Sequence, residues 1–361
     1  MVRLLFFLAV LVLGLAAPAA LASPPQGGQE LSSGYMTVVD EAGQIILQTG
    51  QAVHPGDEYI GPSARLYEVT AVEGTLAKAR YTRDEPPAPL IAPAQPQAAG
   101  RQLIAIYYTH NDESYIPSDG QASIPGNGGI FKVGGAFAGR LTELGYQVEN
   151  DQTRHGPHDA NAYQRSRRTF KRLLEQKPAA LFDIHRDSAP LAAYQATVGG
   201  QPATRLLLVV GRQNPNRQTS LDYAKRIMAA ADSRHPGLVR GIFLAHGNYN
   251  QDMSPRAMLV EVGSQYSSRE AAERSAALLA DLVPLFLAPP AAGPVAPPAD
   301  FAGRTVSYGR DLAVILGLTA AGIAGYLFLS TGSWREARRR LANFRRFEFM
   351  NFLGPRKKNK K

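Results

Sequence analysis

The chain has 361 residues and no cysteine, which excludes disulfides, thiolate metal sites and a cysteine nucleophile. Its formal net charge is +9, but residues 334–361 contain 11 Lys and Arg against 2 Asp and Glu, so this tail holds the whole excess. The remainder contains 28 residues of each sign and is neutral overall. A nucleic-acid-binding role would need a basic face on the folded part, and none is indicated.

The beginning of the chain has the pattern of a secretory signal. Arg3 precedes a long apolar run, and Ala20-Leu21-Ala22 supplies the small residues that are typical of a cleavage site. We therefore predict a signal peptide over residues 1–22, with cleavage after Ala22.

Residues 23–84 predict a small β-rich module. Its short, partly alternating segments are separated by Gly and Pro and cover residues 36–39, 44–48, 65–69 and 77–81. The module has no cluster of ligand-type residues, so we expect it to bind or position rather than to catalyse. A semi-rigid Pro/Ala linker is predicted over residues 85–100.

Residues 101–287 predict one α/β domain, with a mixed or parallel sheet flanked by helices. The predicted strands cover residues 103–108, 146–149, 179–184, 205–210, 242–245 and 257–260. The predicted helices cover residues 131–144, 161–176, 221–232 and 269–287. This alternation of strand and helix is the reason for expecting a single α/β unit.

The remaining residues predict attachment to the cell membrane. A Pro-rich stalk over residues 288–309 leads to a predicted transmembrane helix over residues 310–330, where residues 312–329 carry no charge. The basic segment 331–361 follows it. By the positive-inside rule this tail is cytoplasmic, so the chain is predicted to cross once with the 101–287 domain extracytoplasmic.

Candidate functional residues follow three of the predicted strands. His110 and Glu113 follow the first, His185 follows the strand 179–184, and Glu261 follows the strand 257–260. Open α/β sheets place their sites at the carboxyl ends of strands, so we expect these side chains to meet.

The types of these residues point to metal-dependent hydrolysis. Zinc accepts His nitrogen and carboxylate oxygen, and catalytic zinc keeps one position open beside three protein ligands. A carboxylate that is not a ligand can take a proton from water and hand it to a leaving amine, and Glu261 fits this role. The expected reaction is hydrolysis of an amide bond.

Neighbouring residues have supporting roles in this prediction. Asp183, Asp187 and His158 are candidates for orienting the ligand histidines. Arg186 is predicted to hold a substrate carboxylate by bidentate pairing. Asn250 and Gln251 lie in a polar loop before the last strand and are predicted to line the substrate groove.

Several of these segments together resemble the stage II sporulation protein P family. The segments that carry the resemblance are Tyr108–Tyr115, Phe182–Ser188, Tyr249–Pro255 and Leu259–Gly263, within residues 101–287. The resemblance implies a fold similar to zinc-dependent N-acetylmuramoyl-L-alanine amidases. It also implies cleavage of the amide between N-acetylmuramic acid and L-alanine in peptidoglycan, during engulfment in sporulation.

Residue by residue, the resemblance implies that His110 and His185 are ligands of Zn²⁺ and that Glu261 is the catalytic carboxylate. Glu113 is the third ligand, with Asp119 as the alternative. The implied partners are a lytic transglycosylase and a membrane protein. Two other functions stay open, namely a zinc endopeptidase acting on wall cross-links and a non-catalytic wall-binding scaffold.

Overall fold

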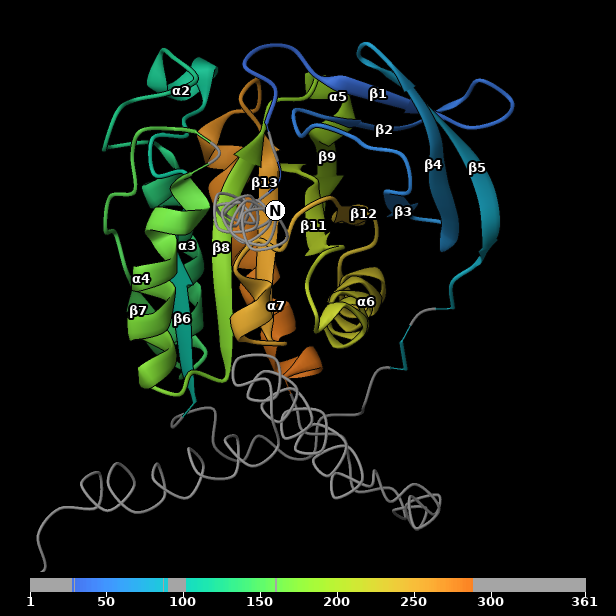
Figure 1. Cartoon of the computed structure of the whole chain (residues 1–361). Coiled ribbons are helices and arrows are strands. Elements are labelled where there is room, and N and C mark those ends of the chain that lie inside the picture. The colour runs from blue at the N-terminus through green and yellow to red at the C-terminus, as the bar shows by residue number, and fades with distance from the viewer. Residues whose placement is uncertain (1–27, 29, 87, 90–101, 160, 288–361) are drawn as a thin grey trace, which may run out of the picture. The chain divides into compact units, whose positions relative to one another are not determined.

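The computed structural model describes residues 28, 30–86, 88–89, 102–159 and 161–287. Within these residues, eleven strands form one mixed sheet (Figure 1). In spatial order they are β2 (Ile45–Thr49), β1 (Met36–Val39), β5 (Leu76–Asp84), β4 (Arg65–Glu73), β3 (Glu58–Ile60), β12 (Val239–Ala245), β11 (Leu206–Gly211), β13 (Ala257–Ser264), β8 (Ala180–Asp187), β6 (Leu103–Tyr107) and β7 (Gln147–Asn150). A separate antiparallel pair consists of β9 (Gln195–Val198) and β10 (Gln201–Thr204).

Helices cover the sheet and connect its strands. The described helices are α2 (Ile116–Asp119), α3 (Ile130–Glu143), α4 (Ala162–Glu175), α5 (Leu191–Tyr194), α6 (Arg217–Arg234), the 3-10 turn η2 (Gln251–Met253) and α7 (Arg269–Phe286). Of the two 18-residue helices α6 and α7, only α7 begins at a residue whose side chain caps it. Helix α7 follows Ser268, whose hydroxyl accepts a hydrogen bond from the Ala271 amide and so satisfies a free helix N–H.

The two faces of the central strands are covered by different helices. On β6, Ile104 and Ile106 pack into a core shared with α3, α6 and α7, whereas Ala105 and Tyr107 pack against α4. Successive side chains of a strand point to opposite faces, so a strand buried on both faces reads as a continuous apolar run. The predicted α/β class, with a large mixed sheet flanked by helices, is confirmed.

The strands that carry the candidate residues lie next to one another. Strand β8 pairs in parallel with both β6 and β13, and His185 stands directly opposite Glu261 in the register. Both strands are longer than the sequence pattern predicts, because pairing continues through their polar residues to Asp187 and Ser264. His185 and Glu261 therefore lie inside strands: Glu261 is paired on both sides, with β11 and β8, and His185 is paired with β13.

The sequence pattern predicts a small module for the N-terminal strands. In the structure these strands continue the same sheet. The three-residue strand β3, too short to be recognised from its sequence, pairs antiparallel with β12 and with β4. The pairing of β3 with β12 could not be predicted, because the residue pattern of a strand does not determine which other strand it pairs with. In Figure 1 the strands β1 to β5 continue from β12 on one side of the sheet.

This N-terminal part curls back toward the candidate residues. Strand β2 is eight positions from β8 in the sheet order, yet the Gly50 amide just after β2 donates to Asp187 Oδ1 at 2.6 Å. A side chain at position 50 would not fit, since a Cβ there would lie 2.5 Å from the Cβ of Ser188. The close approach therefore requires glycine.

Some of the predicted segments lie outside the described residues. These are the signal peptide 1–22, most of the linker 85–100, the stalk 288–309, the transmembrane helix 310–330 and the tail 331–361. In the part of the chain that is described, no helix has the length and apolarity needed to cross a bilayer.

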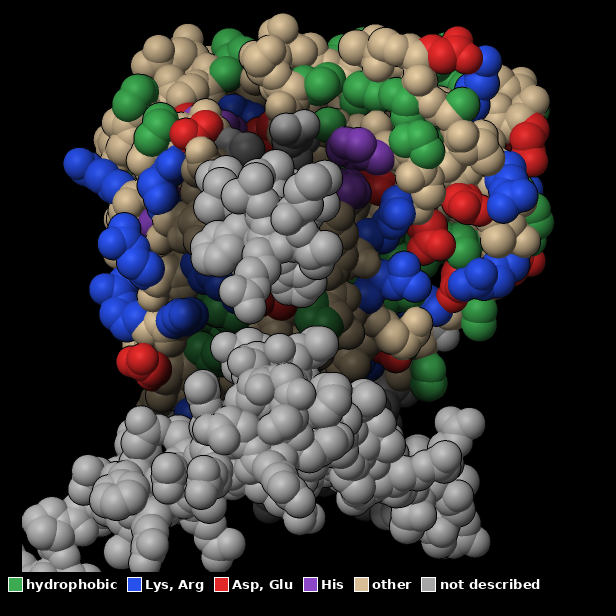
Figure 2. All heavy atoms as spheres, in the orientation of Figure 1, with side chains coloured by type: hydrophobic (Ala, Val, Ile, Leu, Met, Phe, Trp, Pro, Cys, Tyr) green, Lys and Arg blue, Asp and Glu red, His purple; other side chains and the backbone are tan. Residues whose placement is uncertain are grey.

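The surface charges of the N-terminal strands are mixed in sign. Figure 2 shows acidic and basic side chains interspersed on the side of β4 and β5. Arg80 pairs with Glu68 at 2.7 Å, and Lys78 pairs with Glu73 at 3.1 Å. This face therefore lacks the single-sign charge that nucleic-acid binding requires.

Candidate metal centre and catalytic carboxylate

The turn after β6 is held against β8 by a buried aspartate. The Thr109 amide donates to Asp183 Oδ1 at 2.8 Å, and the Thr109 hydroxyl donates to Asp183 Oδ2 at 2.6 Å. The next residue, His110, is thereby brought beside β8 with only 3% of its surface exposed. Asp183 also lies 3.0 Å from His185 Nε2, in agreement with its predicted role in orienting that ring.

His110, Glu113 and His185 meet in one buried cluster. Glu113 Oε1 lies 3.2 Å from His185 Nδ1 and 3.4 Å from His110 Nδ1. The other oxygen of Glu113 accepts a hydrogen bond from the Arg186 amide at 2.8 Å. One carboxylate oxygen is thus fixed by the backbone, while the other faces both imidazoles.

The spacing of these donor atoms suits a zinc ion. Zinc–nitrogen and zinc–oxygen bonds of about 2.0–2.1 Å in tetrahedral geometry put neighbouring ligand atoms about 3.3 Å apart. His110 Nδ1 and His185 Nδ1 both face Glu113 Oε1, and Asp183 holds the other nitrogen of His185. A carboxylate oxygen flanked by two imidazole nitrogens in this way is a donor set that zinc accepts.

Of the two alternatives for the third ligand, the structure places Glu113 beside the histidines and Asp119 elsewhere. Asp119 forms an ion pair with Arg269 and accepts a hydrogen bond from the Tyr115 amide at 3.0 Å. Its carboxylate is therefore committed to joining helix α2 to helix α7.

The charges of the cluster are strongly coupled. Burial alone would raise the pKa of Glu113, but the charge of His185 and hydrogen bonds from both histidines lower it to about 2. Burial alone would lower the pKa of His185, yet the charges of Asp183 and Glu113 hold it well above the usual range. The carboxylates thus create a site that favours positive charge, which a bound cation can supply in place of the protons.

Glu261 lies on the strand next to His185 and is held from one side only. Its exposed fraction is 2%, and Oε1 accepts a hydrogen bond from Gln51 Nε2 at 2.8 Å, whereas Oε2 has no partner among the described residues. Burial raises the pKa of Glu261 well above the usual value, and the nearby Asp187 charge raises it further. Burial and the neighbouring acids therefore favour the protonated form of this carboxyl.

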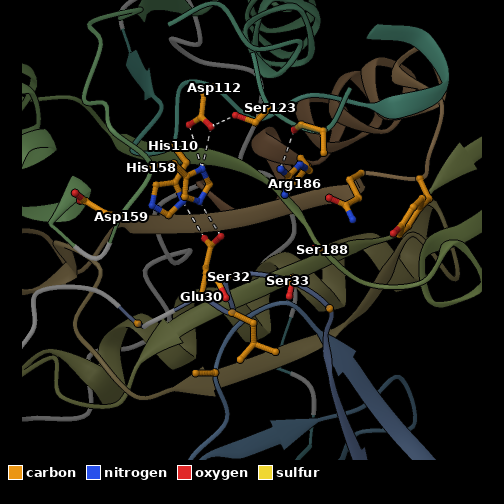
Figure 3. A pocket seen from close by; sticks show the side chains of 17 residues that line it. Glu30, Ser32, Ser33, His110, Asp112, Ser123, His158, Asp159, Arg186 and Ser188 are labelled. Carbon is orange, nitrogen blue, oxygen red and sulfur yellow. Dashed lines mark hydrogen bonds and ion pairs between the residues drawn. The ribbon is translucent and has the colours of Figure 1, made fainter. Parts of the chain in front are cut away.

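Two more side chains, Glu30 and the predicted His158, approach His110. Glu30 Oε1 lies 2.8 Å from His110 Nδ1, and Glu30 Oε2 lies 2.9 Å from His158 Nε2. The rings of His110 and His158 stack with centroids 3.9 Å apart. In Figure 3 the Glu30 carboxylate points at these stacked rings, and Asp112 approaches from the other side. Among the described residues, Glu30, His110, Glu113 and His158 form a group that could hold a metal ion, and His185 is not part of it.

The cluster borders a cavity of about 960 Å³. His110, His158 and Arg186 line it on one side, and the N-terminal segment around Ser32 lines it on the other. Arg186 donates from Nε to the Ser114 carbonyl at 3.3 Å and from Nη2 to the Ala122 carbonyl at 2.9 Å. Its guanidinium therefore borders the cavity, but backbone carbonyls already use part of the fork that was predicted to bind a carboxylate.

Asn250 and Gln251, which were predicted to line the substrate groove, bond to the protein's own backbone. Asn250 donates to the Tyr163 carbonyl, and Gln251 bonds the backbone of β11 through both its amide oxygen and its amide nitrogen. Both side chains are buried and neither lines the cavity. The loop is polar because it must satisfy buried backbone groups, and the sequence pattern alone does not distinguish this use from substrate binding.

The two remaining predicted supports differ in position from the expectation. Asp187 does not contact the ligand histidines and instead accepts hydrogen bonds from Gly50, Tyr194 and the Thr49 hydroxyl. His158 does lie against His110, where Asp112 and Glu30 hold its two nitrogens. Asp187 is therefore a link to the N-terminal strands rather than a support of His185.

Sequence reasoning missed Glu30 and Gln51, both of which reach the cluster from the N-terminal part of the chain. Gln51 is separated from Glu261 by 210 positions, and Glu30 from His158 by 128. Neither stands in a motif of ligand-type residues. No signal in the sequence could have found them, because their importance comes only from the curling of the sheet.

Comparison with solved structures finds N-acetylmuramoyl-L-alanine amidases. The amidase Ami1 from Mycobacterium smegmatis is 12% identical, with 52% of this chain and 96% of that chain covered and a TM-score of 0.35. The CwlD amidase from Clostridioides difficile, solved in complex with the GerS lipoprotein, gives the same identity, coverage and TM-score. Likenesses of this extent say nothing about catalysis.

Comparison with known sequences is more specific. Stage II sporulation protein P of Bacillus subtilis (strain 168) is 28% identical over an alignment of 209 residues. The alignment covers 53% of this chain and 52% of that protein. The chain thus spans about half the length of this relative. The sequence model of the stage II sporulation protein P family matches residues 66–284, which is more than half of the chain. The chain therefore belongs to the stage II sporulation protein P family.

Proposed function

We propose that this protein is a zinc-dependent peptidoglycan hydrolase that cleaves the amide between N-acetylmuramic acid and L-alanine during sporulation. The observation that carries the proposal is the buried cluster of His110, Glu113 and His185, with Glu261 on the adjacent strand. Family membership supports the setting in sporulation.

The residues of the cluster divide the work. A zinc ion held by His110, Glu113 and His185 would polarise the scissile carbonyl and favour attack by water. Glu261 takes the proton of the attacking water as the new C–O bond forms. It then gives that proton to the amide nitrogen as the C–N bond breaks, which releases the peptide as a free amine.

The lining of the cavity supports a substrate that combines sugar and peptide. Hydroxyl and amide side chains border it, and Tyr266 adds an aromatic side chain that is 45% exposed. The hydroxyl and amide side chains of the lining are those of Ser32, Ser33, Ser123, Ser188 and Gln265. Such groups match the hydroxyls and amides of a glycopeptide better than an apolar ligand.

The cellular location in this proposal rests on the sequence alone. The predicted signal over residues 1–22 and the predicted span over residues 310–330 would put the catalytic domain on the outer side of the membrane, with a cytoplasmic basic tail. The wall lies on that side, so the predicted topology brings enzyme and substrate together.

The test is product analysis with the full chain in detergent. The protein is incubated with purified peptidoglycan, with and without a chelator, and the soluble products are weighed by mass spectrometry. Intact stem peptides freed from glycan, lost with chelator and restored by zinc, are the expected result.

Two other results would contradict the amidase assignment. Shortened or unlinked peptides still attached to sugar would mean an endopeptidase. No release under any condition, together with a folded protein that binds no zinc, would mean a wall-binding scaffold.

A further inference from the structure

The N-terminal strands deliver one side chain directly to Glu261. Gln51 follows β2 and is 3% exposed, and its Nε2 donates to Glu261 Oε1 at 2.8 Å. The other oxygen, Glu261 Oε2, has no hydrogen-bond partner among the described residues. One oxygen of the carboxylate is thus engaged, and the other is buried without a hydrogen bond among the described residues.

The orientation of the Gln51 amide is set by its surroundings. The Tyr249 hydroxyl donates to Gln51 Oε1 at 3.2 Å, so the NH₂ group is the end that faces Glu261. The backbone amide of Gln51 donates to the Thr49 hydroxyl at 3.2 Å, and that hydroxyl donates in turn to Asp187 Oδ1. The segment is therefore tied to β8 as well as to the loop before β13.

We propose that Gln51 is the positioning residue of the catalytic carboxylate. It holds Glu261 Oε1 so that Oε2 faces the reacting atoms, an inference that rests on the proposed function. A carboxylate held in one rotamer spends no free energy on reorientation during proton transfer. Gln51 lies outside residues 66–284, so this contact comes from a part of the chain that the family match does not include.

The test replaces Gln51 by an apolar side chain of similar shape. In the zinc-loaded full chain, Gln51→Met is expected to lower kcat on soluble wall fragments by about 10- to 100-fold, the usual effect of losing an orienting partner. KM and zinc content are expected to stay unchanged, because Gln51 is not a ligand. Gln48→Met is the matched control, since Gln48 of β2 donates only to Thr37 in the same pair of strands.

A double-mutant cycle adds a readout that a structural role would not move. Tyr249→Phe alone is expected to lower kcat less than Gln51→Met, because it only loosens the amide. In the Gln51→Met background it should add nothing, since the two residues then act through one contact.

The outcomes separate this inference from the proposed function. An active parent with undiminished kcat in Gln51→Met overturns the inference alone, as does a Gln51→Met protein that loses zinc or cooperative unfolding. A parent that releases no peptide overturns the proposed function and the inference with it.

A different set of contacts concerns Glu30. Its two carboxylate oxygens lie 2.8 Å from His110 Nδ1 and 2.9 Å from His158 Nε2, and its side chain is 23% exposed. His110 Nδ1 is the same nitrogen that faces Glu113. Glu30 therefore stands as a further donor on the side of the cluster that borders the cavity.

A fourth protein donor conflicts with catalysis. Structural zinc sites are closed by four protein ligands, whereas catalytic sites keep one position open. Glu30 belongs with His110, Glu113 and His158 to a group whose ligand atoms lie within 4.8 Å of one another. Glu30 would therefore be a further protein donor to an ion held by His110 and Glu113.

The backbone of this segment lies beside the residues that follow β2. Glu30 forms an isolated bridge with Gln51, and the Leu31 amide donates to the Gly50 carbonyl at 2.8 Å. The following residues, Ser32, Ser33 and Gly34, are exposed. Moving Glu30 away would break these bonds, both ion pairs of Glu30 and the packing of Leu31, but not the pairing of β1 with β2 and β5.

We also infer that Glu30 is an internal ligand that competes with substrate for the open position at the metal. The segment around it must move away before peptidoglycan can bind. The cavity would then extend to the histidines, where the scissile amide must lie. This second inference depends on the contacts of Glu30 and not on those of Gln51.

The test uses Glu30→Gln in the zinc-loaded full chain, with two readouts. A chelator should remove zinc about tenfold faster than from the parent, because a charged donor worth roughly one factor of ten in binding is gone. Hydrolysis of wall fragments should become faster, through a higher kcat/KM. Glu73→Gln is the matched control, since Glu73 pairs with Lys78 on the exposed strands β4 and β5.

Two results would overturn this inference. The first is a chelation rate equal to that of the parent, which would mean that Glu30 is no ligand. The second is a Glu30→Gln protein that binds zinc weakly and loses hydrolysis, which would make Glu30 a required ligand. The chelation assay measures metal binding directly, so neither result depends on which bond the enzyme cleaves.

Discussion

The central strands β6, β8 and β13 and the N-terminal strands β1 to β5 build one sheet in different ways. The residues of β8 and β13 are buried throughout, whereas β5 shows alternating and then exposed residues. The central strands carry His185 and Glu261 themselves. The N-terminal strands carry none of the predicted ligands, yet their flanking residues Glu30 and Gln51 touch the cluster.

The two regions also differ in whether the family match includes them. The match to the family begins at residue 66, inside β4, so Glu30 and Gln51 lie before it. The candidate ligands and Glu261 thus belong to the part shared with the family, and Glu30 and Gln51, which contact them, come from the preceding segment. A peripheral part of a fold can adjust a site without supplying its ligands, provided that it reaches the site in space.

The largest effect is expected from a substitution in the central strands, at Glu261 of β13. Glu261→Gln keeps the shape of the side chain but removes the base, so hydrolysis should fall about a thousandfold, within the usual range for a general base. Zinc content should not change, because Glu261 is not among the proposed ligands. The rate of peptide release and the bound zinc are measured on the same sample.

The control for this variant is Glu68→Gln on β4, where the carboxylate pairs only with exposed Arg80. It should leave the rate unchanged. Glu261→Gln protein that hydrolyses wall at the parent rate, or that has lost its zinc, would contradict the role of Glu261 as a base.

The next effect tests whether the two regions share one core. Leu47 of β2 is 1% exposed and belongs to the same apolar cluster as Leu259 of β13. Leu47→Ala should lower the free energy of unfolding by about 3 kcal/mol, as is usual for a cavity in a buried core. The whole described sheet should unfold in one transition at a lower denaturant concentration.

The exposed Ile45 of the same strand is the control, with 61% of its surface accessible. Ile45→Ala should change the free energy by less than about 0.5 kcal/mol. Two separate transitions in Leu47→Ala, with the later one at the parent midpoint, would show that the N-terminal strands fold independently.

The smallest effect concerns an ion pair between the regions. Glu85, just after β5, pairs with Lys225 of α6, and its side chain is 8% exposed. Burial opposes ionisation, but hydrogen bonds from Lys225 and Arg83 outweigh it and lower the pKa of Glu85 below the usual value.

A lowered carboxyl pKa stabilises the folded state above the unfolded pKa, and the stabilisation is lost as pH falls through the folded pKa. Glu85→Gln should therefore lower the free energy of unfolding by roughly 1 kcal/mol at pH 7, and the difference from the parent should shrink in acid. Denaturant unfolding at several pH values measures it. A difference that grows as the pH falls would contradict this sign.

Much of the fold could be predicted from local patterns. Apolar runs such as Leu103–Tyr107 indicated buried strands, and amphipathic periodicity indicated α4 and α7. Ligand-type residues at the ends of these runs indicated His110, Glu113, His185 and Glu261 as one set. These signals are local, because burial and secondary structure depend on neighbours in the sequence.

The sequence by itself therefore determined the α/β class, the family and the principal candidate residues. Only the tertiary structure decided that β3 joins β12, that Asn250 and Gln251 serve the backbone, and that Asp187 holds the N-terminal strands. It alone brought Glu30 and Gln51 to the cluster. Contacts between residues more than a hundred positions apart leave no periodic trace in one sequence, so they arise only when the sheet closes on itself.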